Sequence, residues 1–128
     1  MISDTHQSAL LLFAHGSSDP GWAAPFVKLQ ANIRRRDPAK IVELAFLERM
    51  QPSFDEVVDA LHAGGIRQVT VAPIFLALGG HMKKDLPALI DAAKARTGME
   101  FRILPALGEV DELIDSMANW VHQASHMP

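Results

Sequence analysis

Two histidines follow predicted strands, at positions where parallel sheets bind ligands. His15 comes directly after the apolar run 9–14, and His81 follows the β-prone segment 67–76 and a pair of glycines. In an open parallel α/β sheet, ligands bind in the crevice outside the carboxyl ends of the strands. Imidazole groups delivered to that crevice favour metal binding or proton transfer. The sequence therefore predicts metal or proton chemistry at this edge of the sheet.

A carboxylate is expected on the same rim. Glu48 follows the predicted strand 40–47, and it is a candidate third metal ligand or a base. The alternative is a surface glutamate paired with Arg49. Because the chain has no cysteine, any metal would be held by histidine, carboxylate or water. These ligands suit divalent first-row metals.

Small residues surround both histidines. Gly16 and Ser17 follow His15, and a loop of small residues lets backbone N–H groups approach a ligand closely. The alternative is an ordinary strand-to-helix loop with a capping serine or aspartate. The loop is therefore a candidate ligand-binding segment.

The segment around the second histidine has the same character. Gly79 and Gly80 permit a wide turn before His81. Lys83 and its neighbour Lys84 are candidate contacts for substrate carboxylates, as point charges. Their alternative role is a solvated first turn of the helix predicted after them.

Strand-like and helix-like segments alternate along the chain. Strands are predicted at 8–14, 40–47, 67–76 and 101–104, and helices at 22–36, from Ser53 to Gly64, at 85–96 and from Val110 through Val121. The apolar run 8–14 is typical of a strand buried on both faces. The sequence Ser53-Phe54-Asp55-Glu56 is a capping box, which predicts the start of the second helix.

This alternation predicts an α/β fold with a four-stranded parallel sheet and helices on both faces. Right-handed crossovers favour the flavodoxin-like strand order 2-1-3-4. That order places His15 and His81 on opposite sides of one crevice. We expect a single domain over residues 1–128, with fraying at 1–7 and 124–128.

Composition excludes several classes of partner. The net charge of −3 argues against nucleic acid as the main partner. No apolar stretch approaches the length of a membrane span. The segment Met1–Gln7 lacks the basic region and apolar core of a signal peptide, so we expect a cytoplasmic protein without membrane contact.

The motifs around these residues, in their order and spacing over about residues 9–120, resemble the sirohydrochlorin chelatase family. The chain is most similar to its small single-domain cobaltochelatases of the anaerobic cobalamin pathway. The motifs that carry this resemblance are Leu12-Phe13-Ala14-His15-Gly16-Ser17, Ala45-Phe46-Leu47-Glu48, Gln51-Pro52-Ser53, Val71-Ala72-Pro73-Ile74-Phe75-Leu76 and Gly79-Gly80-His81-Met82-Lys83-Lys84-Asp85-Leu86-Pro87.

The resemblance implies a chelatase-like domain that inserts a divalent metal into sirohydrochlorin without ATP or another nucleotide. Cobalt(II) is the first choice of metal. The alternatives are iron(II), as in a siroheme-type ferrochelatase, and nickel(II). It implies that His15 and His81 coordinate the metal. Some relatives add the glutamate that corresponds to Glu48, and small members of the family work as homodimers.

Two other functions compete with this one. The first is phosphoryl transfer with His15 as the nucleophile, but histidine phosphatases have an arginine where this chain has Ala14. The second is a non-catalytic carrier of metal or tetrapyrrole that uses the same crevice. A carrier would bind both ligands without accelerating metal insertion.

Overall fold

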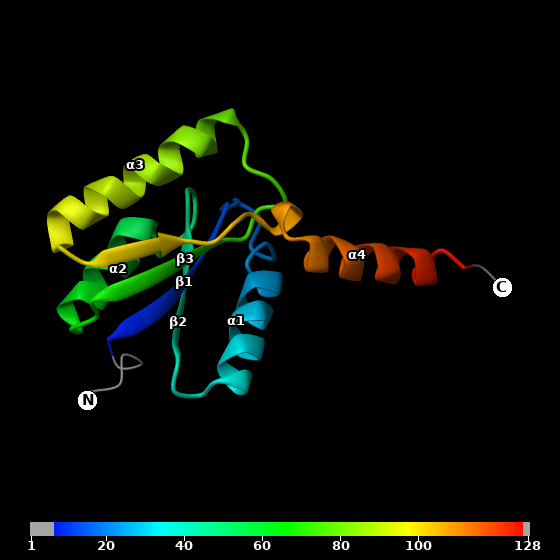
Figure 1. Cartoon of the computed structure of the whole chain (residues 1–128), viewed down its shortest axis with the longest axis horizontal. Coiled ribbons are helices and arrows are strands. Elements are labelled where there is room, and N and C mark those ends of the chain that lie inside the picture. Colours follow the sequence, from blue (N-terminus) through cyan, green and yellow to red (C-terminus); the bar gives the residue numbers. More distant parts are fainter. Residues whose placement is uncertain (1–6, 127–128) are drawn as a thin grey trace.

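The computed structural model describes residues 7–126, which form one parallel sheet flanked by helices (Figure 1). In chain order the elements are β1 (Ser8–Ala14), α1 (Ala24–Arg36), β2 (Ile41–Phe46), α2 (Phe54–Ala63), β3 (Gln68–Pro73), α3 (Gly80–Thr97), β4 (Glu100–Ile103), the 3-10 helix η2 (Leu107–Glu109) and α4 (Asp111–Ala124). The four strands are parallel and lie in the order β2-β1-β3-β4, which confirms the predicted fold class and topology.

Strand β1 is the centre of the sheet. Leu12 pairs in register with Leu44 of β2 and with Ala72 of β3. Leu11 and Leu12 point to opposite faces of the sheet, yet both are almost completely buried. The continuous apolar run of β1 is explained by this burial on both faces.

Helices α2 and α3 cover one face of the sheet (Figure 1). Phe13 of β1 and Phe54 of α2 meet there edge to face, with ring centroids 5.2 Å apart. Leu86 and Ile90 of α3 are buried in the same cluster. Burying a side chain of this size contributes about 1.5–3 kcal/mol, so this face supplies the main core.

Helix α1 covers part of the other face. Phe26, Leu29 and Ile33 recur at helical spacing and pack over β1 and β2. Gln30 Nε2 and Arg34 Nη2 donate to the Val42 carbonyl of β2 at 2.8 and 2.6 Å. The helix is thereby held towards the β2 side of the sheet.

The start of α2 is the predicted capping box. The Ser53 hydroxyl accepts from the Glu56 N–H at 3.2 Å, and the Glu56 carboxylate accepts from the Ser53 N–H at 3.3 Å. Both bonds satisfy N–H groups that a helix start would otherwise leave without a partner.

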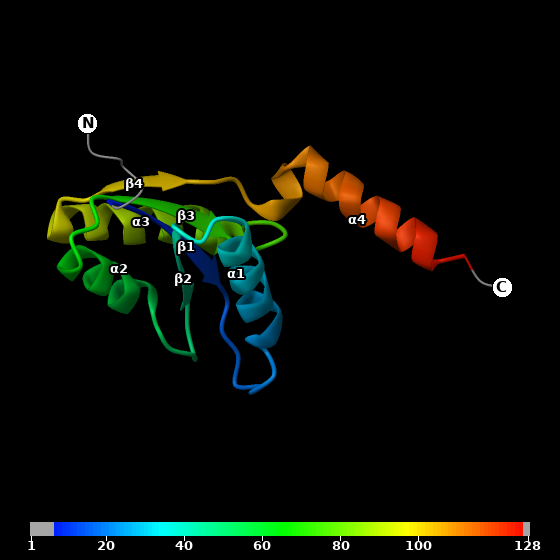
Figure 2. The ribbon, with the colours of Figure 1, turned by 90° about the horizontal axis from the view of Figure 1, so that it is seen from below.

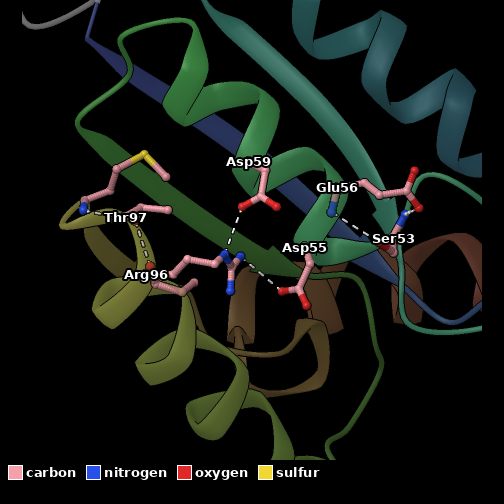
Figure 3. A network of polar contacts seen from close by, with 8 residues as sticks. Ser53, Asp55, Glu56, Asp59, Arg96 and Thr97 are labelled. Carbon is pink, nitrogen blue, oxygen red and sulfur yellow. Dashed lines mark hydrogen bonds and ion pairs between the residues drawn. The ribbon is translucent and has the colours of Figure 1, made fainter.

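An ion cluster joins α2 to α3 (Figure 3). Arg96 Nε lies 2.9 Å from Asp59 Oδ1, and Arg96 Nη2 lies 3.4 Å from Asp55 Oδ1. The hydrogen bond to Asp59 raises the pKa of the Arg96 guanidinium above its usual value, so the cation persists. This cluster is an exposed tie between two helices and does not belong to the sheet edge that bears His15.

The third strand and third helix differ from their predicted bounds. Strand β3 ends at Pro73 instead of residue 76, and α3 begins at Gly80 instead of residue 85. Beyond Pro73 the regular strand pairing ends, because β1 ends at Ala14 and β4 at Ile103, and a single 2.7 Å bond from the Ile74 N–H to the Phe13 carbonyl follows it. The apolar residues that follow are used for packing, since Phe75 is buried in the α2–α3 core.

Helix α4 departs from the sheet (Figure 2). The sequence correctly predicts the helix, but every one of its residues is exposed and none lies on the sheet. None of the helices in residues 7–126 combines the length and the apolar character needed to cross a membrane.

The described chain begins at Gln7, whose carbonyl accepts backbone hydrogen bonds from Arg67 and Gln68. The fraying predicted for 1–6 and 127–128 falls outside the described residues.

Candidate functional site

His15 lies at the carboxyl end of β1, as predicted, and its surroundings hold it in place. Its ring packs on Phe75, with ring centroids 4.5 Å apart. Its carbonyl accepts a 2.7 Å hydrogen bond from the indole Nε1–H of Trp22. About half of the His15 side chain remains exposed, so the imidazole is oriented and still open to a ligand.

Glu48 is the nearest charged partner of this imidazole. Glu48 Oε1 lies 3.4 Å from His15 Nδ1, and its side chain is also partly exposed. The pairing of β1 with β2 continues one step past the strands, through the Leu47 N–H and the Ala14 carbonyl at 2.8 Å. This extra step brings the residues that follow each strand side by side.

The backbones of the two loops also interlock. A Cβ on Gly16 would lie 1.7 Å from the Glu48 carbonyl oxygen, so only glycine fits there. The Met50 N–H donates to the same oxygen at 2.8 Å, across Arg49, whose φ of 66° is left-handed. A non-glycine residue in this conformation is uncommon and costs energy. The tight turn therefore fixes the carbonyl of Glu48 against the His15 loop.

His81 occupies the second position of α3 and is exposed. It is eight residues past the end of β3, because the strand is shorter than predicted. Within residues 7–126, no three histidine, aspartate or glutamate side chains gather closely enough to hold a metal ion. The structure thus brings together His15 and Glu48 but does not join His81 to them.

The glycines before His81 have a different role from the predicted wide turn. Gly79 is the N-cap of α3, with extended backbone angles, and Gly80 is already helical. A Cβ on either residue would meet nothing within 4 Å. Lys83 lies exposed in the first helical turn, and it belongs to none of the ion pairs within residues 7–126.

The loop after His15 is ordered by its own side chains. The Ser17 hydroxyl accepts from the Asp19 N–H at 3.0 Å, and Asp19 Oδ1 accepts from the Gly21 N–H at 2.9 Å. These bonds match the alternative of an ordinary capped loop. The expected contacts of Gly16 and Ser17 with a ligand stay a prediction.

Two aromatic residues that contact His15 were not predicted to belong to the site. Trp22 was expected on the stripe of a helix, but it precedes α1 and binds the His15 carbonyl. Phe75 was expected within a strand, but it lies beyond β3 and packs against the His15 ring. For Trp22 the available signal was the indole N–H, a donor that commonly binds an acceptor; for Phe75 the sequence offered none.

Comparisons with known proteins identify the family of the chain. The CbiX family model matches residues 9–124. Proteins named sirohydrochlorin cobaltochelatase match 81 or 82 residues, or 63–64% of this chain: the identity is 30% in Methanococcus aeolicus, 34% in Methanocaldococcus jannaschii and 35% in Saccharolobus islandicus. The matched segment spans 57–62% of those relatives.

Solved structures share the fold. A protein from Marinobacter aquaeolei VT8, described as a cobalamin biosynthesis CbiX protein, superposes with a TM-score of 0.82 at 32% identity. The superposition covers 91% of this chain and 96% of that one. The sirohydrochlorin chelatase SirB of Bacillus subtilis subspecies spizizenii, in complex with cobalt, superposes with a TM-score of 0.77 at 21% identity. That match covers 91% of this chain and 50% of SirB, and it supports the fold alone.

Proposed function

Because the chain belongs to the CbiX family, we propose that it inserts a divalent metal ion into sirohydrochlorin without ATP or another nucleotide. Cobalt(II) is the proposed physiological metal, and iron(II) or nickel(II) is the alternative. The observation that carries the proposal is the His15–Glu48 pair, open to solvent at the carboxyl edge of the sheet. The names of the cobaltochelatase relatives support the same reaction.

His15 is proposed to bind the incoming metal through Nε2. Glu48 lies on the Nδ1 side of the ring, so a hydrogen on Nδ1 would face the carboxylate and leave the Nε2 lone pair free. A carboxylate in this position fixes the ring and raises the basicity of the other nitrogen. Glu48 is also the proposed acceptor of a proton, or a further ligand.

Metal insertion has two requirements that this open pair meets. The metal must exchange some of its water for protein ligands and must then leave, so a closed four-ligand site would hold it too tightly. The two pyrrole N–H protons of the macrocycle must also be removed. Imidazole and carboxylate groups at the rim are suitable acceptors for them.

His81 is proposed as the second imidazole ligand. It is exposed in the first turn of α3, after the mostly exposed segment 76–80. Gly79 and Gly80 are proposed to let the macrocycle approach this turn, and Lys83 to pair with one of its carboxylates. Gly16 and Ser17 are the proposed contacts on the His15 side.

The assembly and location are proposed with the reaction. The chain is expected to work as a homodimer in the cytoplasm, with the tetrapyrrole as its partner and without nucleic acid or membrane contact. The net charge of −3 supports the absence of a nucleic-acid partner.

Anaerobic insertion assays test the function. Sirohydrochlorin is mixed with Co²⁺, Fe²⁺ or Ni²⁺, and absorbance follows the metallated product. We expect acceleration by the wild type and a loss of more than about 100-fold in His15→Ala and His81→Ala, beyond the usual cost of removing an outer partner of a ligand. His62→Ala is the control, because His62 lines a hollow of about 590 Å³ near the amino ends of the strands.

The outcomes separate the candidate functions. If the protein binds metal and macrocycle but does not accelerate metal insertion, the carrier function is favoured. Normal insertion by both His15→Ala and His81→Ala would refute the proposed site. Acceleration with Fe²⁺ alone would make the chain a ferrochelatase.

A further inference from the structure

Arg49 has a backbone conformation that side chains with a Cβ rarely adopt. Its φ is 66°, and among residues 7–126 it is the only residue other than glycine with a positive φ. The Met50 N–H donates to the Glu48 carbonyl across Arg49 at 2.8 Å, so these three residues form a γ-turn. A γ-turn whose central φ is positive is rare and strained.

The backbone of this turn does not require an arginine. Glycine adopts a positive φ without the steric cost of a Cβ, and asparagine tolerates it better than most residues. The turn is fixed from outside, because a Cβ on Gly16 would meet both the Glu48 carbonyl and the Met50 nitrogen. Strained residues held in this way cluster at functional sites. The strain at Arg49 is therefore explained only if its side chain has a task.

Contacts within the described chain do not supply that task. Arg49 takes part in none of the ion pairs formed within residues 7–126. The arginine side chains that donate hydrogen bonds in this part of the chain all belong to α1 or α3. Glu48, the partner suggested by the sequence, faces His15 instead. The exposed guanidinium of Arg49 is thus available to a ligand.

The γ-turn lies on the rim that bears the proposed metal ligands. Glu48 begins the turn, and its carboxylate lies 3.4 Å from the His15 imidazole. The next residue is Arg49, which therefore extends from the same turn as a proposed ligand. A guanidinium stays protonated and has no free lone pair, so it cannot coordinate a metal. Its ligand at this rim must be an anion.

We propose that Arg49 binds a carboxylate of the tetrapyrrole while metal is transferred at His15, a role that rests on the proposed function. A guanidinium presents paired N–H donors that match the two oxygens of a carboxylate, and such charge-assisted bonds are strong. The carboxylates of sirohydrochlorin lie on its periphery, whereas the metal enters at its centre. One macrocycle can therefore contact Arg49 and receive the metal at the same time.

Arg49 would complement Lys83 in orienting the macrocycle. Arg49 follows β2, and Lys83 lies beyond β3 in the first turn of α3. These two strands flank β1, which ends beside His15. A single cation would let the ring turn about its contact, whereas contacts on both sides of His15 fix the orientation of the ring.

Three substitutions separate the side chain of Arg49 from the turn. Arg49→Gly removes the guanidinium and relieves the strained φ, so the melting temperature should not fall. Arg49→Asn also suits the positive φ. Arg49→Lys keeps the charge but loses the paired donors. A structural role predicts no loss of activity in the glycine variant, whereas substrate binding predicts weaker binding by a protein of unimpaired stability.

Steady-state insertion of Co²⁺ into sirohydrochlorin provides the main measurement. We expect KM for sirohydrochlorin to rise about 10-fold or more in Arg49→Gly and Arg49→Asn, and less in Arg49→Lys, with little change in kcat. Calorimetric titration without the macrocycle should give the wild-type affinity for Co²⁺. Arg36→Gly is the charge-matched control and should leave KM unchanged, because Arg36 ends α1 at the opposite edge of the sheet, before β2 begins.

Three results in an active wild type would overturn the role of Arg49 and keep the chelatase. The first is an unchanged KM in Arg49→Gly. The second is an equal rise of KM in Arg36→Gly, which attraction by overall charge explains. The third is weaker Co²⁺ binding in Arg49→Gly, which would assign the loss to a disturbed His15–Glu48 pair.

Binding without insertion separates the two proposals in the other direction. If the wild type binds sirohydrochlorin but inserts no metal, absorbance titrations give Kd for the same variants. A loss of affinity in Arg49→Gly but not in Arg36→Gly would then keep the role of Arg49 and discard the chelatase. A wild type that does not bind sirohydrochlorin would overturn both.

Discussion

The carbonyl oxygen of Glu48 occupies the place where a side chain on Gly16 would begin. The distance from that oxygen to an added Cβ is 1.7 Å, which no folded chain accepts without movement. The close approach of these two backbones sets the separation of 3.4 Å between His15 Nδ1 and Glu48 Oε1. The geometry of the site thus depends on a residue with no functional group.

Substitution of Gly16 by alanine is expected to damage both the fold and the site. The methyl group would push the two loops apart, at a cost of about 1–3 kcal/mol in the free energy of unfolding. His15 and Glu48 would separate, and Co²⁺ binding would weaken. Urea unfolding and calorimetric titration with Co²⁺ measure the two effects. Wild-type values for both would contradict the interlocked loops.

Substitution of Glu48 by glutamine tests its role beside His15. The amide keeps the shape of the side chain but loses the charge and the capacity to accept a proton. We expect metal affinity or insertion rate to fall about 10–100-fold, as for other carboxylates that support a histidine ligand. Glu43→Gln is the matched control, since that glutamate contacts Arg34 within α1 and β2. If the two variants have the same metal affinity and insertion rate, Glu48 has no special role beside His15.

Alanine at Gly80 is expected to leave the fold intact. An added Cβ would meet nothing within 4 Å, and the residue is already helical. Replacing a helical glycine stabilises a protein by about 0.5–1 kcal/mol. Thermal unfolding should therefore show a small gain. If KM for sirohydrochlorin nonetheless rises, the new methyl group obstructs the macrocycle, and an unchanged KM would remove Gly80 from the binding surface.

Lys83 and Lys84 allow a comparison between neighbours. Both side chains are exposed near the start of α3, but they project about 100° apart around the helix. We expect Lys83→Ala to raise KM for the tetrapyrrole with little change in kcat, because a substrate contact is lost. Lys84→Ala should do less. Identical effects would indicate general attraction of a polycarboxylate instead of a defined contact.

Much of the fold follows from patterns that are local in the chain. The run 8–14 becomes the central strand, and its nearly continuous apolar sequence is typical of a strand buried on both faces. The capping box at Ser53 starts α2 because two side chains satisfy two backbone N–H groups there. The alternation of elements and right-handed crossovers narrow the possible strand orders, and the favoured order 2-1-3-4 is the observed one.

The differences arise where tertiary contacts decide. Phe75 is of a residue type that favours strands. Because the neighbouring strands have ended at this point, its side chain packs on the core and on His15 instead. His81 was expected at a strand end, and an earlier helix start places it in α3. For α4 the apolar period predicts the helix but does not indicate that the helix leaves the sheet.

The bonds from Gln30 and Arg34 to Val42 have a consequence for aggregation. An edge strand with free backbone groups is a template on which a foreign strand can add. At the outer edge of β2 the Val42 carbonyl already accepts two side-chain donors, and Arg34 also pairs with Glu43 of the same strand at 3.8 Å. At this position of β2 a foreign strand would first have to displace both side chains.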